Sequence, residues 1–190
     1  HDNIDVYLQT VISDAWVEND TIKGVIISTK EGLQVLGATV VIDATGDGEL
    51  AYLAGCEYML GREQDNLCQP MTLCFRMSGV DKEKYLKNHA KMSQVYKEFK
   101  AKGLIKNPRE DILTFGNYND GVIHFNTTRI VKMNPTDPFE VTKAEIEARE
   151  QVFEMLDFLK DRSYRKKRYA EHIDITEKCI GKSFDEIELI

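Results

Sequence analysis

The chain has 190 residues, enough for one large domain or two small ones with a real hydrophobic core. Its formal net charge is −7, so we expect no nucleic acid among its partners, because a phosphate backbone attracts a basic surface. Hydrophobic residues make up 42% and charged residues 30%, a mixture typical of globular proteins. No apolar run approaches the roughly 18 residues that a membrane-spanning helix needs, so we also expect no membrane span.

The chain starts at His1 and runs straight into strand-like sequence, so we expect it to be a fragment of a longer protein. Its first ten residues lack the charged and apolar regions of a signal peptide. The cysteines have neither the spacing of a metal site nor the density of a disulfide framework, and we expect no metal. Unpaired thiols slightly favour the cytoplasm, a reducing compartment. The cysteines are Cys56, Cys68, Cys74 and Cys179.

The first part of the chain predicts an antiparallel meander. Alternating residues rich in Val, Ile, Tyr and Trp, separated by polar turns, indicate strands at 5–19, 21–29 and 33–44. The apolar run at 38–44 is typical of a strand that is buried on both faces, as in an α/β sheet. A glycine turn and a short helix ending at Gly55 follow.

A polar stretch places a domain boundary near residue 61. Beyond it we expect a second sheet and two long helices. Thr142 and Glu145 form a capping box that predicts the start of the second helix, with Phe153 in its apolar stripe. The basic cluster at 162–169 is typical of a solvated surface or linker. The other expected elements are a strand at 71–80, a helix at 81–103, an irregular stretch at 104–120, a bent strand at 121–131 and a short strand at 172–176.

The glycine turn matches the pattern G-x-G-x-x-A, with Gly46, Gly48 and Ala51 at its key positions. Glycines at the end of a strand allow close backbone approach, and N–H groups at a helix start face an anion. The alternative is a tight turn between strand and helix, in which Asp47 is an ordinary N-cap. The spacing alone leaves both interpretations open.

Three stretches carry a resemblance to a known family: 24–58 with the motif VIDATGDGELA, 69–81, and 124–161. Together they resemble the FAD-dependent oxidoreductases of the glutathione-reductase-like superfamily, specifically the bacterial group with an ATGDGDLA-type motif. The resemblance implies an α/β fold, α+β in this fragment. It implies that 1–60 is the C-terminal part of the FAD-binding domain, with the meander and last strand of a Rossmann-like fold, and that 61–190 is a mixed substrate or cap domain.

The resemblance also implies FAD as cofactor and a set of cofactor-binding residues. These are Ala44, Thr45, Gly46, Asp47 and Gly48 in the turn, and Val11, whose backbone would contact the adenine. The family begins with a G-x-G-x-x-G turn for the FAD pyrophosphate and has a further flavin-contacting segment near its C-terminus. Neither is present here, so we expect the chain alone to be inactive.

The resemblance implies hydride transfer through FAD on a small organic substrate. Candidate catalytic residues on the substrate side are His124, suited to proton transfer, and Arg129, suited to a substrate carboxylate. Strand alternation puts them on opposite faces unless a bulge intervenes at 126–128. The alternative is a truncated, non-catalytic binding or interaction module. The coding sequence upstream of His1 would discriminate the two, and the sequence does not indicate the oligomeric state.

Overall fold

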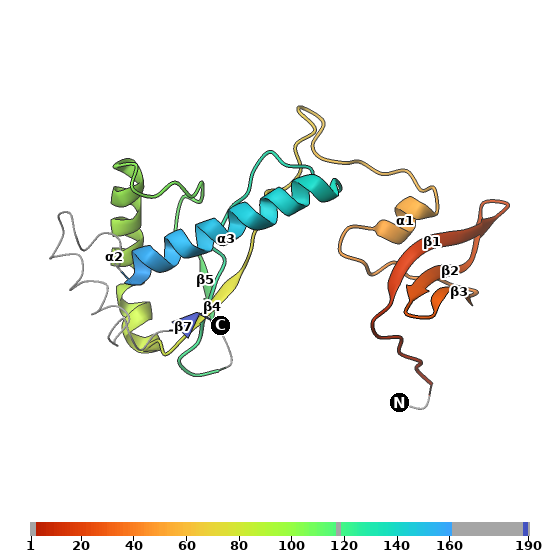
Figure 1. Ribbon diagram of the computed structural model, residues 1–190, viewed down its shortest axis with the longest axis horizontal. Coiled ribbons are helices and arrows are strands. Elements are labelled where there is room, and N and C mark those ends of the chain that lie inside the picture. The colour runs from red at the N-terminus through yellow and green to blue at the C-terminus, as the bar shows by residue number, and fades with distance from the viewer. Residues whose placement is uncertain (1–2, 117–118, 161–187, 190) are drawn as a thin grey trace. The chain divides into compact units, whose positions relative to one another are not determined.

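The computed structural model describes residues 3–116, 119–160, 188 and 189. They fall into two compact units, one up to Leu60 and the other from Gly61 onward (Figure 1). The fold is mixed α+β, and the described residues form two small antiparallel sheets and three helices. The basic cluster and the strand expected at 172–176 lie outside the described residues.

The first unit contains the predicted antiparallel meander, with strand order β1-β2-β3. A tight turn joins the first two strands: Glu18 pairs with Thr21, and the two residues between them have positive φ angles of 47° and 56°. That conformation suits the twist of a two-residue hairpin. The first strand begins at Val11, so the strand expected from residue 5 is shorter than predicted. The bounds are β1 Val11–Glu18, β2 Thr21–Thr29 and β3 Gly32–Gly37.

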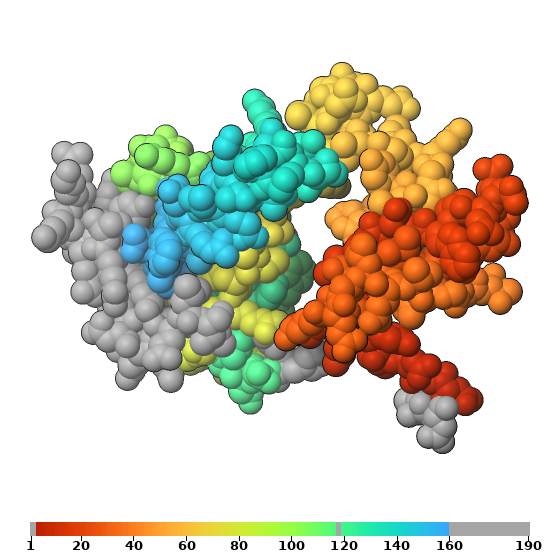
Figure 2. Space-filling view, turned by 45° about the vertical axis from the view of Figure 1, so that its right-hand side comes forward, coloured from red at the N-terminus to blue at the C-terminus, as the bar shows by residue number. Residues whose placement is uncertain are grey.

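The expected buried strand at 38–44 is not formed. The chain leaves the meander after Ala38, whose N–H donates to the Lys23 carbonyl at 2.9 Å. Val40 and Ile42 are 77% and 85% exposed. A strand buried on both faces needs neighbouring strands and covering layers, and no described strand pairs with residues 38–44. The segment therefore remains irregular and mostly exposed in this unit, whose surface is red to orange in Figure 2.

The short helix α1 spans Glu49–Leu53 and follows the glycine turn. It ends as predicted at Gly55, whose φ is 81°. The Gly55 N–H donates to the Tyr52 carbonyl and the Cys56 N–H to the Ala51 carbonyl, both at 3.0 Å. This pair of bonds is the Schellman motif, which satisfies the last carbonyls of a helix.

The second unit is built on a four-stranded sheet with strand order β5-β6-β4-β7. One strand, β5, arises in the stretch expected to be irregular. With three residues it offers too little alternation to detect, and it forms only because Phe115 pairs with His124 on β6. The strand expected at 71–80 is shorter, although Met71 forms an isolated bridge with Ile130. The bounds are β4 Phe75–Ser78, β5 Thr114–Gly116, β6 Ile123–Phe125 and β7 Glu188–Leu189.

Two long helices complete this unit (Figure 1). Helix α2 spans Lys82–Ala101, and Asp81 is its N-cap, accepting from the Lys84 N–H at 3.0 Å. Helix α3 spans Pro138–Lys160 and so starts before the predicted capping box.

The predicted cap of α3 at Thr142 is wrong. The side chain of Asp137 accepts from the N–H groups of Phe139 at 2.8 Å and Glu140 at 3.1 Å. Thr142 lies inside the helix, where its hydroxyl donates to the Pro138 carbonyl at 2.7 Å. Aspartate followed by proline at the first helical position is a favoured helix start, and it lies only five residues upstream.

The main core of the second unit joins both helices to the sheet. Phe158 of α3 packs edge-on against Tyr96 and Phe99 of α2, with ring centroids 5.6 and 5.5 Å apart. Phe75 and Phe125, on β4 and β6, stack at 5.0 Å. Phe153 was expected in this core but is 59% exposed. Among the residues that the structure describes, no helix has the length and apolar composition needed to cross a membrane.

Candidate functional site

The glycine turn of the first unit is held by Asp43, the last polar residue before it. One carboxylate oxygen, Oδ1, accepts from the Thr45 N–H at 2.9 Å and from the Thr45 hydroxyl at 2.7 Å. The other, Oδ2, accepts from the Ala51 N–H at 2.9 Å. The Thr45 hydroxyl oxygen in turn accepts from the Glu49 N–H at 2.9 Å. Two side chains thus satisfy the first turn of α1 and fix the path of residues 44–48.

These hydrogen bonds also set the charge state of Asp43. The Thr45 hydroxyl, followed by the N–H groups of Thr45 and Ala51, lowers the pKa of the Asp43 carboxyl below its usual value. Asp43 is therefore a carboxylate throughout the neutral range. Its negative charge stays next to the start of the helix, where a helix dipole favours it.

The backbone on the outer side of this turn is open. Gly48 is the N-cap of α1 in a left-handed conformation with φ 71°, and it has no side-chain cap. A Cβ added at Gly46 or Gly48 would meet no atom within 4 Å. The N–H groups of Gly46, Asp47 and Gly48 have no acceptor among the described residues. Asp47 is exposed and does not cap the helix, so the N-cap interpretation of Asp47 is wrong.

Val11 is the first residue of β1 and is 67% exposed. It pairs with Ser28 at the end of the β1–β2 ladder. Because β1 is an edge strand, its backbone pairs with β2 on one side and with no described strand on the other.

His124 lies in the middle of β6, between Arg76 of β4 and Phe115 of β5. The Arg76 Nε lies 3.5 Å from His124 Nδ1, and the Phe115 ring centroid lies 6.2 Å from that of His124. The imidazole is half-buried. Its immediate neighbours are thus a cation and an aromatic ring.

Arg129 follows β6 and is held by its backbone as well as by its side chain. Its N–H donates to Gln151 Oε1 at 2.8 Å, and its carbonyl accepts from Gln151 Nε2 at 3.1 Å. Its guanidinium NH1 donates to both oxygens of Glu110, at 2.5 and 2.7 Å. None of the contacts among the described residues joins Arg129 to His124, so the two substrate-side candidates are not brought together.

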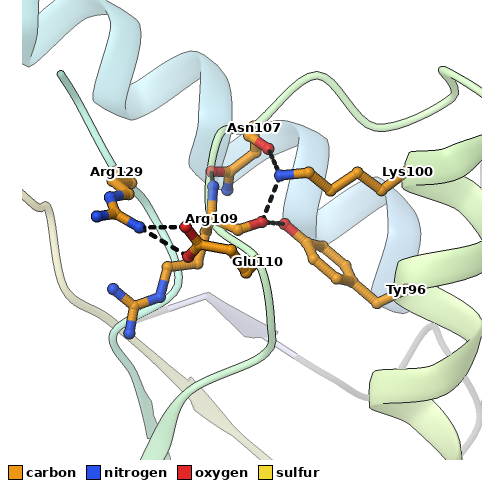
Figure 3. A network of polar contacts seen from close by, with 6 residues as sticks. All are labelled: Tyr96, Lys100, Asn107, Arg109, Glu110 and Arg129. Atoms are coloured by element: carbon orange, nitrogen blue, oxygen red, sulfur yellow. Dashed lines mark hydrogen bonds and ion pairs between the residues drawn. The ribbon is translucent and has the colours of Figure 1, made fainter.

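A polar network anchors the loop that carries Glu110 (Figure 3). Lys100 Nζ donates to the carbonyls of Asn107 at 2.7 Å and Arg109 at 2.6 Å. The Tyr96 hydroxyl donates to the same Arg109 carbonyl at 3.2 Å. Burial raises the pKa of Tyr96 and lowers that of Lys100.

Sequence reasoning missed Asp43, Glu110 and Gln151. Asp43 left a signal, because an aspartate two residues before a threonine commonly accepts from its backbone N–H. Glu110 and Gln151 left no signal in the sequence, because each contacts Arg129 from a distant part of the chain. Among the described residues, no three His, Cys, Asp or Glu side chains gather as a metal-ligand set.

A family model described as FAD dependent oxidoreductase matches residues 1–177. The chain belongs to this family. The resemblance found in the sequence is therefore confirmed at the level of the family, and FAD is the cofactor of these FAD-dependent oxidoreductases. No curated protein and no solved structure matches the chain. Within the described residues the N–H groups of the glycine turn are unpaired and a Cβ at Gly46 or Gly48 would meet nothing, so the turn fits a cofactor that carries phosphates.

Proposed function

We propose that this chain forms part of an FAD-dependent oxidoreductase of the glutathione-reductase-like superfamily, in the bacterial group with an ATGDGDLA-type motif. Residues 1–60 would be the C-terminal part of its FAD-binding domain and residues 61–190 its substrate or cap domain. The observation that carries the proposal is the family match over residues 1–177, which includes the open glycine turn. The reaction is hydride transfer on a small organic substrate.

The residues that would hold FAD are the backbone of Ala44–Gly48 and, on β1, Val11. Bound FAD supplies the acceptor or donor of the hydride, two electrons and one proton. The turn contributes N–H groups that have no competing acceptor in the described part of the chain, and Asp43 and Thr45 keep these groups in place. A turn that is fixed before binding loses less conformational freedom when the cofactor arrives.

The second unit would supply the groups on the substrate side. A neutral imidazole such as that of His124 has one ring nitrogen that can donate a proton and one that can accept a proton. Arg129 can bind a carboxylate through a planar fork of N–H donors. The two side chains have separate surroundings, so we assign them separate roles, proton transfer for His124 and orientation of the substrate for Arg129.

Replacement of Gly46 by valine tests the proposal in protein expressed from the complete coding sequence. The structure has open space around Gly46, and its φ is not positive, so Gly46→Val should leave the fold intact. A branched side chain at this point would still block backbone approach by a cofactor. We expect wild-type protein to carry FAD and the variant to lose it. The measurement is the ratio of flavin to protein absorbance after gel filtration.

Gly116→Val is the matched control, because Gly116 also has open space and no positive φ, but lies on β5 of the second unit. We expect this variant to keep its flavin. A folded wild-type protein without flavin would contradict the proposal and favour the non-catalytic binding module. A full flavin complement in Gly46→Val would remove the glycine turn from the cofactor site.

A further inference from the structure

The guanidinium of Arg129 is only partly used. A bidentate arginine–carboxylate pair normally engages two nitrogens of the fork, each with its own oxygen. Here NH1 alone donates to both Glu110 oxygens. Nε and NH2 have no acceptor among the described residues. Figure 3 shows this pair with Arg109, whose guanidinium also has no acceptor within the described part of the chain.

The backbone of Arg129 is fixed by a buried side chain. Gln151 is buried in α3 and both donates to and accepts from the Arg129 backbone. Its amide is itself oriented by Glu147, one turn earlier, at 3.0 Å. A position set by a buried amide is far more precise than one set by an exposed loop. The guanidinium therefore extends from a rigid base.

The loop that carries Arg109 is fixed in the same way. Asn107 is buried, and its side chain donates to the Thr127 carbonyl at 2.8 Å while accepting from the Arg109 N–H at 2.9 Å. Lys100 and Tyr96 hold the Arg109 carbonyl from the opposite side. Two arginines with open donors thus extend from two anchored backbones, and one of them, Arg129, pairs with the Glu110 carboxylate.

Glu110, the carboxylate that pairs with Arg129, is largely exposed. Its side chain is 70% exposed, whereas that of Arg129 is 31% exposed. Its own backbone N–H lowers the pKa of the Glu110 carboxyl, and the charges of Arg129 and Arg109 lower it further, so it is ionised at neutral pH. Exposed ion pairs contribute little to stability, so an external carboxylate can compete with Glu110.

We propose that Arg129 and Arg109 bind a small molecule that carries a carboxylate, and that Glu110 occupies this site until the ligand displaces it. The group already bound shows the chemistry that the site accepts, a planar anion with two oxygens. Binding needs no flavin. That the ligand is the substrate of the oxidoreductase rests on the proposed function.

The test is a titration of the full 190-residue chain with succinate, followed through the arginine Nε–H signals in NMR spectra. Glu110→Gln removes the competitor, and we expect it to tighten succinate binding about 2- to 5-fold, the range that an exposed ion pair allows. We expect Arg129→Gln to abolish saturable binding and Arg109→Gln to weaken it. Succinamide, which has the same shape without charge, should not bind.

The control is Glu145→Gln. Glu145 pairs with Arg149 on α3, and both side chains of this pair are more than half exposed. Among the described residues, no second arginine pairs with Glu145. We expect it to leave succinate binding unchanged. Three results would overturn the proposal: equal succinate affinity in the Glu110 and Glu145 variants, no saturable binding in either wild type or Glu110→Gln, or inorganic phosphate binding more tightly than succinate.

The Glu110→Gln result does not depend on whether the arginine variants fold, because it is measured on a separate variant that changes only a side chain that is 70% exposed. Circular dichroism spectra of all four variants establish that they fold. Since succinate binding is read without flavin, a failure here leaves the flavin test of Gly46→Val untouched, and the reverse also holds.

Discussion

Asp43 illustrates how one side chain can organise a candidate cofactor site without facing it. The sequence places it in an apolar run, where a carboxylate looks out of place. In the structure its two oxygens accept from Thr45 and Ala51 and define the turn between them. The bond to Thr45 is local and could be predicted from the spacing. The bond to Ala51 spans eight residues and depends on where α1 starts, which the spacing does not specify.

The lowered pKa of Asp43 predicts a pH-dependent contribution to stability. The unfolded chain has the ordinary aspartate value of about 3.9, and the folded value lies below it. The stabilisation is therefore fully present above the unfolded value and is lost as the pH falls through the folded value. We expect Asp43→Asn to be less stable than wild type at neutral pH, with a difference that shrinks in acid. Urea denaturation across this pH range measures it.

Asp47→Asn is the matched control. It removes the same charge only four residues further along the chain, and the Asp47 side chain does not cap the helix. We expect its stability to follow wild type at every pH. If both variants lose the same stability, the effect is a general one of charge near the helix start. The hydrogen bonds of Asp43 would then have no special role.

At the scale of elements, the sequence predicted the strands and helices whose residue patterns depend only on neighbouring positions in the chain. Alternation and turn residues indicated β1, β2 and β3, and Asp81 marked the start of α2. The prediction of a buried strand at 38–44 was wrong. An apolar segment forms such a strand only where other strands pair with it, and no described strand does so here. The predicted start of α3 was wrong because two capping signals lie five residues apart. Spacing alone does not rank Asp137 against Thr142.

The start of α3 gives a direct test of that ranking. Asp137 satisfies two N–H groups that have no partner within the helix, so Asp137→Ala should cost about 1 kcal/mol of unfolding free energy. Thr142→Ala should be neutral or slightly stabilising, because alanine has the higher helix propensity and the lost bond is internal to the helix. Denaturant midpoints with an unchanged slope measure both. A larger loss at Thr142 than at Asp137 would restore the sequence-based cap.

At the scale of the whole molecule, the sequence could assign residue types to two regions but not the partners within each. The family resemblance located the glycine turn in the first unit, and residue chemistry selected Arg129 in the second. The position of Arg129 is determined by Glu110 and Gln151, which are distant in sequence. Glu110 contacts its guanidinium from another loop, and Gln151 contacts its backbone from α3. Long-range polar pairs of this kind leave no periodic pattern.

Two of the phenylalanines of α3, Phe158 and Phe153, test how the second unit is held together. Phe158 is 2% exposed and lies edge-on against two rings of α2, so Phe158→Ala should cost about 3–5 kcal/mol through lost burial and the cavity left behind. Phe153→Ala, one and a half turns away on the same helix, removes a side chain that is 59% exposed and should change stability by less than about 0.5 kcal/mol. Because α2 and α3 are the long helices of the described chain, far-UV circular dichroism during urea denaturation follows this unit. Equal losses for the two variants would mean that Phe153 is buried as the sequence pattern predicted, and that the packing of α3 against α2 is rotated from the arrangement described above.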